Sequence, residues 1–159
     1  MKYASIVRAD IANGEHFRVS LFVSGCSRNC KGCFNKEAQD PEFGKPFDEE
    51  AKQKIFSELK HDWCKGLSLL GGEPLSKLSD NRKQIIALAK EVKEKFPTKD
   101  IWCWSGYTLE EIQADDSMKD ILKYIDVLVD GPFIEEQKDL SIPFRGSRNQ
   151  RILKRGVDF

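Results

Sequence analysis

The chain has 159 residues, the size of one domain, and its 26 basic and 26 acidic residues give a formal net charge of zero. A zero net charge argues against a nucleic-acid-binding protein driven by bulk charge. No apolar stretch approaches the length of a membrane span, and the start of the chain lacks the apolar segment of a secretory signal. We therefore expect a cytoplasmic protein that binds neither nucleic acid nor a membrane.

The first predicted element is a buried strand over residues 19–25, which ends at a glycine and leads directly into three clustered cysteines. Cys26, Cys30 and Cys33 form a C-x3-C-x2-C pattern. Three thiolates this close together can bind three corners of one metal cluster and leave the fourth corner without a protein ligand. Structural zinc usually takes four protein ligands, whereas cubane iron–sulfur clusters prefer cysteine thiolates. The spacing therefore predicts one 4Fe–4S cluster with an iron open to a substrate or cofactor.

Other uses of these cysteines stay open at this point. Disulfides are disfavoured because the chain has five cysteines, an odd number, and no secretory signal. Zinc would need His16 or His61 as a fourth ligand, and neither lies at a familiar zinc-ligand spacing. An ordinary electron-transfer cluster would need Cys64 or Cys103 as its fourth ligand.

Helices are predicted between the strands. The first begins after Asp48 as its N-cap and ends near residue 59, and the second begins at Ser79 and ends before Pro97. Thr108 and Glu111 form a capping box that begins a third helical region, which restarts near residue 117 and runs to about residue 124.

Three more apolar runs, each ending at a glycine, predict buried strands over residues 67–72, 101–106 and 126–131. Strands that alternate with helices indicate a parallel α/β sheet with right-handed crossovers. A complete eight-stranded barrel needs about 250 residues, so we expect a single domain over residues 1–159, folded as a partial, open parallel β/α barrel. The four glycines then lie at one edge of the sheet, beyond the C-terminal ends of the strands, where ligands bind in such folds.

Residues at this edge are candidates for cofactor binding. Gly71 and Gly72 expose backbone N–H and C=O groups that can hydrogen-bond an amino acid moiety, and we expect a Cβ at Gly72 to intrude on the cofactor. Ser105, at the end of the third strand, is placed to face the cofactor. Trp102 and Trp104 are expected to pack in the core.

Two features near the C-terminus are also candidates. Asp130 ends the fourth strand and is a candidate active-site acid, with a turn-forming role as the alternative. Residues 145–155 carry five basic side chains and no acidic one. We expect the tail, about residues 145–159, to be either a docking surface for a partner or a flexible end.

Taken in order, these motifs resemble a known family. The segments DIANG at 10–14, LFVSGC and CKGCFN around the cysteines, LSLLGGEPL, DIWCWSGYTLEE, DVLVDGPF and FRGSRNQR are similar to those of radical S-adenosylmethionine (SAM) proteins that activate anaerobic ribonucleoside-triphosphate reductases. The resemblance runs from about residue 10 to residue 151. It implies the partial barrel of the radical SAM fold, a single 4Fe–4S cluster on the three cysteines, and SAM bound to the open iron through its amino and carboxylate groups.

The resemblance also implies further cofactor contacts. The segment formed by Gly32, Cys33 and Phe34 is expected to contact the adenine of SAM, and the segment from Gly71 to Glu73 is expected to bind its amino group. The cofactor carries the difficult chemistry, while the protein binds and orients it.

The activity implied by the resemblance is that of a radical SAM oxidoreductase. Reductive cleavage of SAM yields a 5′-deoxyadenosyl radical, which removes a hydrogen from one glycine of the large reductase subunit and leaves a glycyl radical there. The implied partners are this large subunit and an electron donor such as a reduced flavodoxin. Two alternatives are a small radical SAM enzyme that acts on a small molecule, and an iron–sulfur electron carrier or redox sensor.

Overall fold

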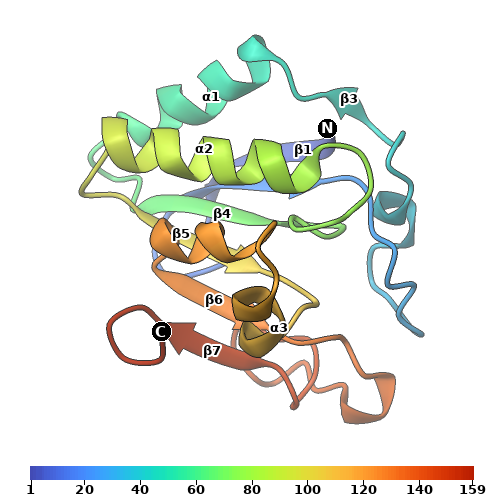
Figure 1. The fold of residues 1–159 in the computed structure, drawn as a ribbon. Coiled ribbons are helices and arrows are strands. Elements are labelled where there is room, and N and C mark those ends of the chain that lie inside the picture. Colours follow the sequence, from blue (N-terminus) through green and yellow to red (C-terminus); the bar gives the residue numbers. More distant parts are fainter.

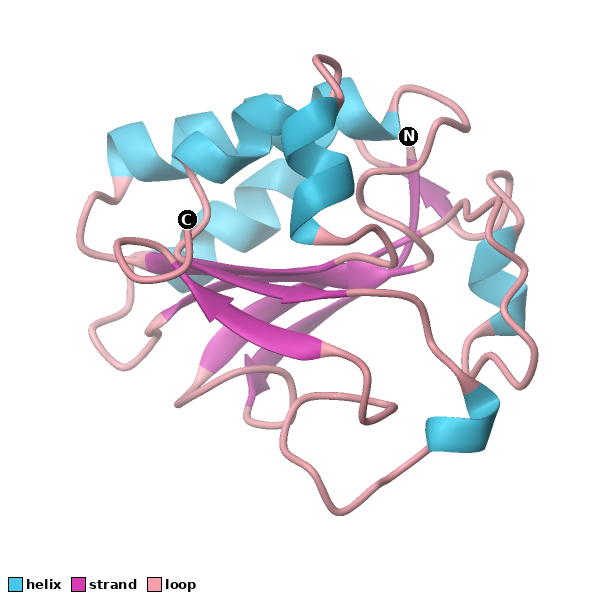
Figure 2. Ribbon diagram, turned by 60° about the horizontal axis from the view of Figure 1, so that its bottom comes forward, coloured by secondary structure: helices cyan, strands magenta, loops and turns pink.

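The structure, a computed structural model, describes residues 1–159 and contains one open seven-stranded sheet with α-helices on one face (Figures 1 and 2). Its strands run in the order β3-β1-β2-β4-β5-β6-β7. Their bounds are β1 Lys2–Asp10, β2 Arg18–Val23, β3 Lys45–Pro46, β4 Gly66–Gly71, β5 Asp100–Trp104, β6 Val127–Asp130 and β7 Arg151–Lys154. The four central strands β2, β4, β5 and β6 are parallel, and the outer strands are antiparallel to their neighbours. The expected α/β class and the partial, open barrel are confirmed.

All four predicted strands form, and they are the four parallel ones. The sequence analysis did not predict β1, β3 and β7. Most residues of β1 and β7 are not buried, and in β7 only Leu153 is buried. These strands therefore lack the continuous apolar run that marks a central parallel strand.

The α-helices are α1 Glu49–Leu59, α2 Asn81–Lys95 and α3 Leu109–Ala114, and the 3-10 segments are η1 Lys36–Gln39, η2 Lys119–Lys123 and η3 Glu135–Gln137. Asp48 caps α1 by accepting a hydrogen bond from the Ala51 N–H at 2.9 Å, and the capping box of Thr108 and Glu111 is present at α3. None of these helices is long and apolar enough to cross a membrane.

One helix boundary was predicted wrongly. Ser79 does not cap α2, because the helix begins one residue later, after Asp80, and Ser79 itself has a φ of 54°. Local sequence patterns fix such a boundary only to within one or two residues. The helical region expected to restart near residue 117 is present as the short 3-10 element η2.

The main hydrophobic core fills the space between the sheet and the helices. A smaller apolar cluster lies on the opposite face of the sheet, where Trp102 stacks on Trp104 with ring centroids 5.6 Å apart and meets Phe144 edge-on. Loops, not helices, cover this second face (Figure 2). The second face therefore has room for a cavity next to the strand ends.

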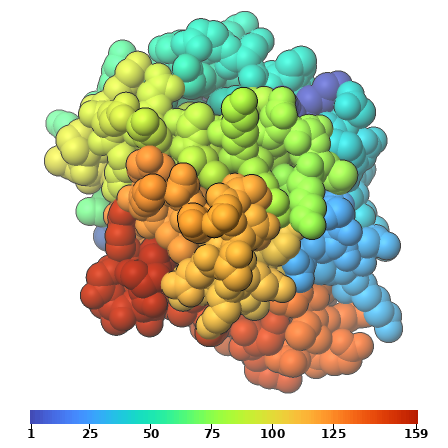
Figure 3. Space-filling model, viewed as in Figure 1, coloured from blue at the N-terminus to red at the C-terminus, as the bar shows by residue number.

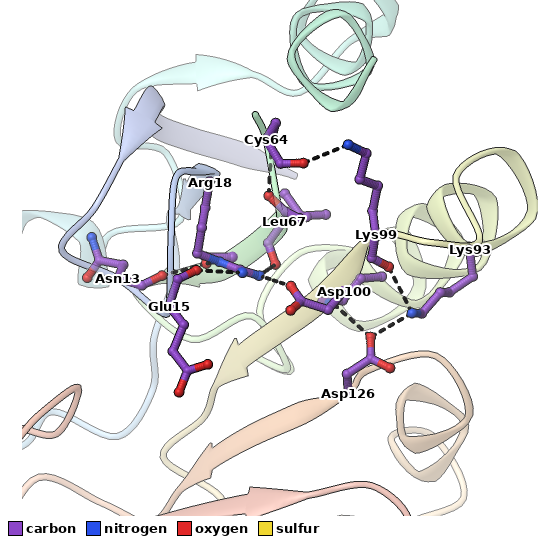
Figure 4. A network of polar contacts seen from close by, with 12 residues as sticks. Asn13, Glu15, Arg18, Cys64, Leu67, Lys93, Lys99, Asp100 and Asp126 are labelled. Carbon is purple, nitrogen blue, oxygen red and sulfur yellow. Dashed lines mark hydrogen bonds and ion pairs between the residues drawn. The ribbon is translucent and has the colours of Figure 1, made fainter. Parts of the chain in front are cut away.

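A buried arginine joins the strands at the end opposite their carboxyl termini (Figure 4). Arg18 is fully buried, donates from Nε to the Ser68 hydroxyl at 2.8 Å and from Nη2 to the Leu67 carbonyl at 3.0 Å, and pairs with Asp100. Its guanidinium also lies 5.6 Å from the centre of the Trp102 ring. These contacts hold β2, β4 and β5 in register at their starts, so that their carboxyl ends lie side by side at the other end of the sheet.

Candidate functional site

A cavity of about 560 Å³ lies at the carboxyl ends of the parallel strands. One part of its wall is polar and includes all three clustered cysteines, and another part is mainly apolar. The polar part is lined by Cys26, Arg28, Cys30, Cys33, Gly71, Gly72, Glu73, Ser105 and Gly106. The apolar part is lined by Phe22, Leu70, Trp104, Val129, Phe133, Leu140, Ile142 and Phe144. The cavity therefore brings together motifs that follow three different strands.

The cysteine loop is held by backbone hydrogen bonds to the segment around η1. Gly25 N–H donates to the Ala38 carbonyl at 2.6 Å, and Cys26 N–H donates to the Gln39 carbonyl at 3.0 Å. The three cysteines are partly exposed and form no disulfide. Burial raises the pKa of the Cys26 thiol, because a thiolate is poorly solvated there.

The donor set fits an iron–sulfur cluster better than a single metal ion. No three His, Cys, Asp or Glu side chains are arranged to hold one ion. A cubane cluster binds each thiolate on a different iron, so its cysteines need not converge on one point. Three thiols that share a cavity wall without a common centre meet this requirement.

The two remaining cysteines lie elsewhere. Cys64 and Cys103 are buried in the main core on the helix side of the sheet and do not line the cavity. His61 stacks on Trp63 with ring centroids 5.1 Å apart, also outside the cavity. The fourth ligand that a closed electron-transfer cluster or a zinc site requires is thus not provided by these residues.

Gly71 and Gly72 line the cavity and also support the cysteine loop. Gly72 N–H donates to the Val23 carbonyl at 2.8 Å. A Cβ at Gly72 would lie 2.5 Å from the Ala38 carbonyl oxygen and 2.8 Å from the Gly25 carbonyl oxygen. This Cβ would therefore strike the backbone that holds the cysteine loop, a packing constraint that the sequence analysis did not foresee.

Glu73 connects the ends of β4 and β5. Its carboxylate is 2% exposed; Oε1 accepts from Leu75 N–H at 3.0 Å and from the Ser105 hydroxyl at 2.9 Å, and Oε2 accepts from Gly106 N–H at 2.6 Å. Burial raises the pKa of Glu73, although these hydrogen bonds act in the opposite direction. The side chain therefore positions Ser105 and Gly106, and it places an acidic group in the polar part of the cavity wall.

The residues expected at the adenine are only partly brought together. Cys33 and Phe34 line the cavity, and Gly32 does not. Phe34 is 59% exposed and packs on Phe133 with ring centroids 5.0 Å apart, while the Lys138 ammonium lies 5.0 Å from the centre of the Phe34 ring. The cysteine loop thus contacts the segment after β6, and Figure 3 shows the two surfaces adjoining, blue against orange, at the lower right.

Asp130 does not line the cavity, although the next residue, Gly131, does. Its carboxylate is 1% exposed, accepts from Leu109 N–H at 2.7 Å and pairs with Arg151 through contacts of 3.0 and 2.5 Å. These partners place Asp130 at the start of α3 and against β7. The geometry favours a structural role over that of an active-site acid.

The FRGSRNQR segment braces the loop that follows β6. Gln150 donates to the Gly131 carbonyl at 3.0 Å, Asn149 donates to the Pro132 carbonyl at 2.7 Å, and the buried Ser147 hydroxyl accepts from Ile134 N–H at 3.2 Å. The start of the tail, residues 145–150, therefore packs inward through its uncharged polar side chains, and β7 continues the sheet.

Sequence reasoning missed several lining residues. Trp104, expected in the core, lines the cavity and donates from its indole N–H to the Phe144 carbonyl at 2.7 Å. Arg28 and Phe144 were not considered as site residues, whereas Phe133 belongs to the DVLVDGPF motif and Arg145 to the basic tail that were considered above. Arg28 lies between Cys26 and Cys30 in the sequence, and this position is the one local feature that could have identified it as a site residue.

Comparisons with known proteins agree with this geometry. Residues 12–153 match the family model described as a 4Fe-4S single cluster domain. The chain is 44% identical over 156 residues to the anaerobic ribonucleoside-triphosphate reductase-activating protein of Pasteurella multocida, covering 97% of this chain and 98% of that protein. It is 45% identical to the protein of the same name from Vibrio cholerae and 40% identical to that of Escherichia coli strain K12, in each case over 154 residues that cover 96% of this chain and 97% of the relative.

Proposed function

The chain belongs to the family of anaerobic ribonucleoside-triphosphate reductase-activating proteins, with a 4Fe–4S single cluster domain, and on that basis we propose that it activates such a reductase by forming a glycyl radical on the large subunit. One observation carries the proposal: the cysteine motif and the glycine-rich segment after β4 line the same cavity in a chain that matches these relatives over nearly its whole length.

We propose that Cys26, Cys30 and Cys33 hold the cluster and leave one iron for the amino and carboxylate groups of SAM. A cluster held there and reduced by an electron donor would supply the electron for cleavage of SAM into methionine and a 5′-deoxyadenosyl radical, and transfer of a hydrogen atom from a glycine Cα of the partner would then give 5′-deoxyadenosine and a glycyl radical.

The protein's own residues bind and orient the reactants. Gly71 and Gly72 offer backbone to the amino acid end of SAM, and Glu73 fixes the adjacent ends of β4 and β5. Phe34 and Cys33 border the place of the adenine. The apolar wall around Trp104 and Phe144 shields one side of the reacting atoms from water, and the partner is expected to cover the rest, which protects a carbon radical from side reactions.

The alternatives predict different behaviour. A small radical SAM enzyme acting on a small molecule would cleave SAM productively without any partner chain. An electron carrier or redox sensor would use a cluster closed by a fourth cysteine, and Cys64 and Cys103 are both buried in the main core instead.

Electron paramagnetic resonance on the reduced protein, SAM and the large reductase subunit tests the proposal. With partner deuterated at glycine Cα, we expect a narrowed radical doublet and deuterium in 5′-deoxyadenosine. A radical signal without deuterium transfer would show that another residue or route intervenes. Loss of the signal in a partner whose target glycine is replaced by alanine is the matched control.

A further inference from the structure

The guanidinium of Arg28 lies in the polar part of the cavity without an anionic partner. Among the residues that line the cavity, only Arg28, Glu73 and Arg145 are charged. The Nε of Arg28 is buried and makes no hydrogen bond. A buried donor without a partner costs free energy comparable to a lost hydrogen bond. Because Arg28 lines the cavity, its guanidinium is placed to meet a group that enters from outside the chain.

Glu73 does not fill this role. Its two carboxylate oxygens already accept three hydrogen bonds, from Leu75, Ser105 and Gly106. It acts on Arg28 only through the charge of its carboxylate and forms no hydrogen bond with it. Arg28 and Glu73 are thus separate groups on the same wall, and Arg28 keeps its hydrogen-bond donors for an anion that enters the cavity.

The position of Arg28 is fixed from two sides. Its guanidinium carbon lies 4.9 Å from the centre of the Tyr107 ring, a cation–π contact. A Cβ at Gly106 would lie 2.4 Å from Arg28 Cδ and 2.7 Å from its Nε, so the absence of a side chain at Gly106 leaves the space that Arg28 occupies. The side chain is held in place before any ligand arrives, which lowers the entropic cost of binding.

We propose that Arg28 binds the carboxylate of SAM, an inference that rests on the proposed function. The amino acid end of SAM carries one carboxylate, and Arg28 belongs to the same short loop as the cysteines that lie around this end. Arg145 is the other cation, but it lies in the apolar part of the wall beside Phe144, and its Nε donates to the Pro143 carbonyl at 3.3 Å. A planar guanidinium matches a carboxylate with two parallel hydrogen bonds.

The test compares the affinities of SAM and of decarboxylated SAM, which lacks only this anion. Equilibrium binding is measured under anaerobic conditions on reconstituted protein whose iron content has been determined. We expect Arg28→Gln to weaken SAM binding by about tenfold or more, because hydrogen bonds to charged groups are the stronger ones. The affinity for decarboxylated SAM should be the same in the variant and the unchanged protein.

Three further variants keep the test decisive. Arg82→Gln is the control, because the Arg82 guanidinium also lies near the Tyr107 ring, at 5.5 Å, but does not line the cavity; it should bind both ligands normally. Arg28→Lys should lose part of the preference for SAM. Gly106→Ala should displace the Arg28 side chain and so remove the preference for SAM, although Arg28 itself is still present. If Arg28→Gln does not retain iron, Gly106→Ala takes its place in the test.

Two outcomes overturn the proposal. Equal weakening of both ligands in Arg28→Gln would show that Arg28 does not contact the carboxylate, and so would an unchanged affinity for SAM. Either result leaves the proposed function intact as long as the unchanged protein binds SAM. Failure of the unchanged, iron-loaded protein to bind SAM would overturn the proposed function and this inference together.

Discussion

At the scale of single residues, the site depends on side chains whose partners are far away in the sequence. The Glu73 carboxylate meets Ser105, 32 residues later, and Gly106, 33 residues later. The surroundings of the cysteines also depend on the fold. Three cysteines lie at the cavity and two lie in the core, although all five have the same side chain. Position in the fold therefore decides which thiols border the cavity and which acid connects two strand ends.

Each single replacement of Cys26, Cys30 or Cys33 by alanine should abolish cluster binding, because each thiolate is expected to hold a different iron. Iron and sulfide analysis after anaerobic reconstitution measures this. Cys64→Ala and Cys103→Ala are the controls; both should retain iron, while the cavity each leaves in the core lowers stability. A requirement for either core cysteine in cluster assembly would contradict the open-iron arrangement.

Glu73→Gln should destabilise the protein by about 1–3 kcal/mol near pH 5, because the amide nitrogen cannot accept the hydrogen bond from Gly106 N–H. Denaturant unfolding of the reduced, metal-free protein measures the change. Glu94→Gln, at an exposed position on α2, is the matched control and should change stability little. Equal stability of both variants would mean that the Glu73 network contributes nothing.

The cost of Glu73→Gln should also depend on pH. Burial raises the folded-state pKa of Glu73 above the ordinary value of 4.5, so the folded chain holds this proton more tightly than the unfolded chain does. The free energy of unfolding contributed by Glu73 is then largest below the ordinary value and falls as pH rises through the folded pKa. The stability difference between the unchanged protein and Glu73→Gln should therefore narrow as pH rises from about 4.5. A difference that widens over this range would contradict the direction of the pKa shift.

At the scale of elements, the site is held by contacts between strand ends and the loops that follow them. The end of β4 supports the cysteine loop through Gly72, and the carboxylate at the end of β6 is paired with β7 through Arg151. In both places two segments pack closely against each other, so the substitution of one side chain should displace both segments.

Gly72→Ala should reduce iron binding, not only SAM binding, because its Cβ would approach the Ala38 and Gly25 carbonyl oxygens to 2.5 and 2.8 Å and displace the cysteine loop. Overpacking of this kind costs about 1–3 kcal/mol. Iron content and thermal unfolding measure the effect. Gly156→Ala is the control, because nothing lies within 4 Å of its Cβ and the positive φ of 85° is the one source of strain that the alanine would meet. Full iron content with weakened SAM binding in Gly72→Ala would instead support the view that this Cβ faces the cofactor.

Arg151→Gln should lower stability by about 2 kcal/mol or more, because it leaves the buried Asp130 carboxylate without its cation. Glu110→Gln removes the other acidic partner of Arg151. The Glu110 side chain is 66% exposed, so this variant should lower stability much less than Arg151→Gln does. Denaturant unfolding of the two variants gives the comparison. Similar losses in both would show that the burial of Asp130 does not matter.

At the scale of the whole molecule, the sheet is covered by helices on one face and carries the cavity on the other, with the strand ends open between loops (Figure 2). The chain is short, and most of it forms the sheet, its helices and the loops that brace the cavity. Apolar side chains at the cavity remain partly exposed, with Phe34 at 59% and Leu140 at 75%. This is the arrangement expected if a partner completes the site.

Cleavage of SAM should therefore depend on the large reductase subunit. In the absence of the large subunit, 5′-deoxyadenosine should form slowly, or form without producing a glycyl radical, because water still reaches the cavity. When the large subunit is present, its loop should close the site. The rate of 5′-deoxyadenosine formation under anaerobic reduction, with and without partner, measures this, and a partner lacking its target glycine is the control. A high rate that the partner does not change would favour the small-molecule alternative.

The sequence by itself determined the chemistry of the site and the centre of the sheet. Cysteine spacing is a local property, and four apolar runs ending at glycines are sufficient to identify parallel strands buried on both faces. The expected site residues Cys26, Cys30, Cys33, Gly72 and Ser105 accordingly lie at one cavity.

The tertiary structure alone decided the supporting contacts. The direction of the Gly72 Cβ, the three donors around Glu73, the pairing of Asp130 with Arg151 and the free guanidinium of Arg28 all depend on residues from separate elements. Local patterns report periodicity and capping, which act over a few residues. Hydrogen bonds and close packing between distant segments leave no such pattern, because each group is placed by the fold as a whole and not by its neighbours in the chain.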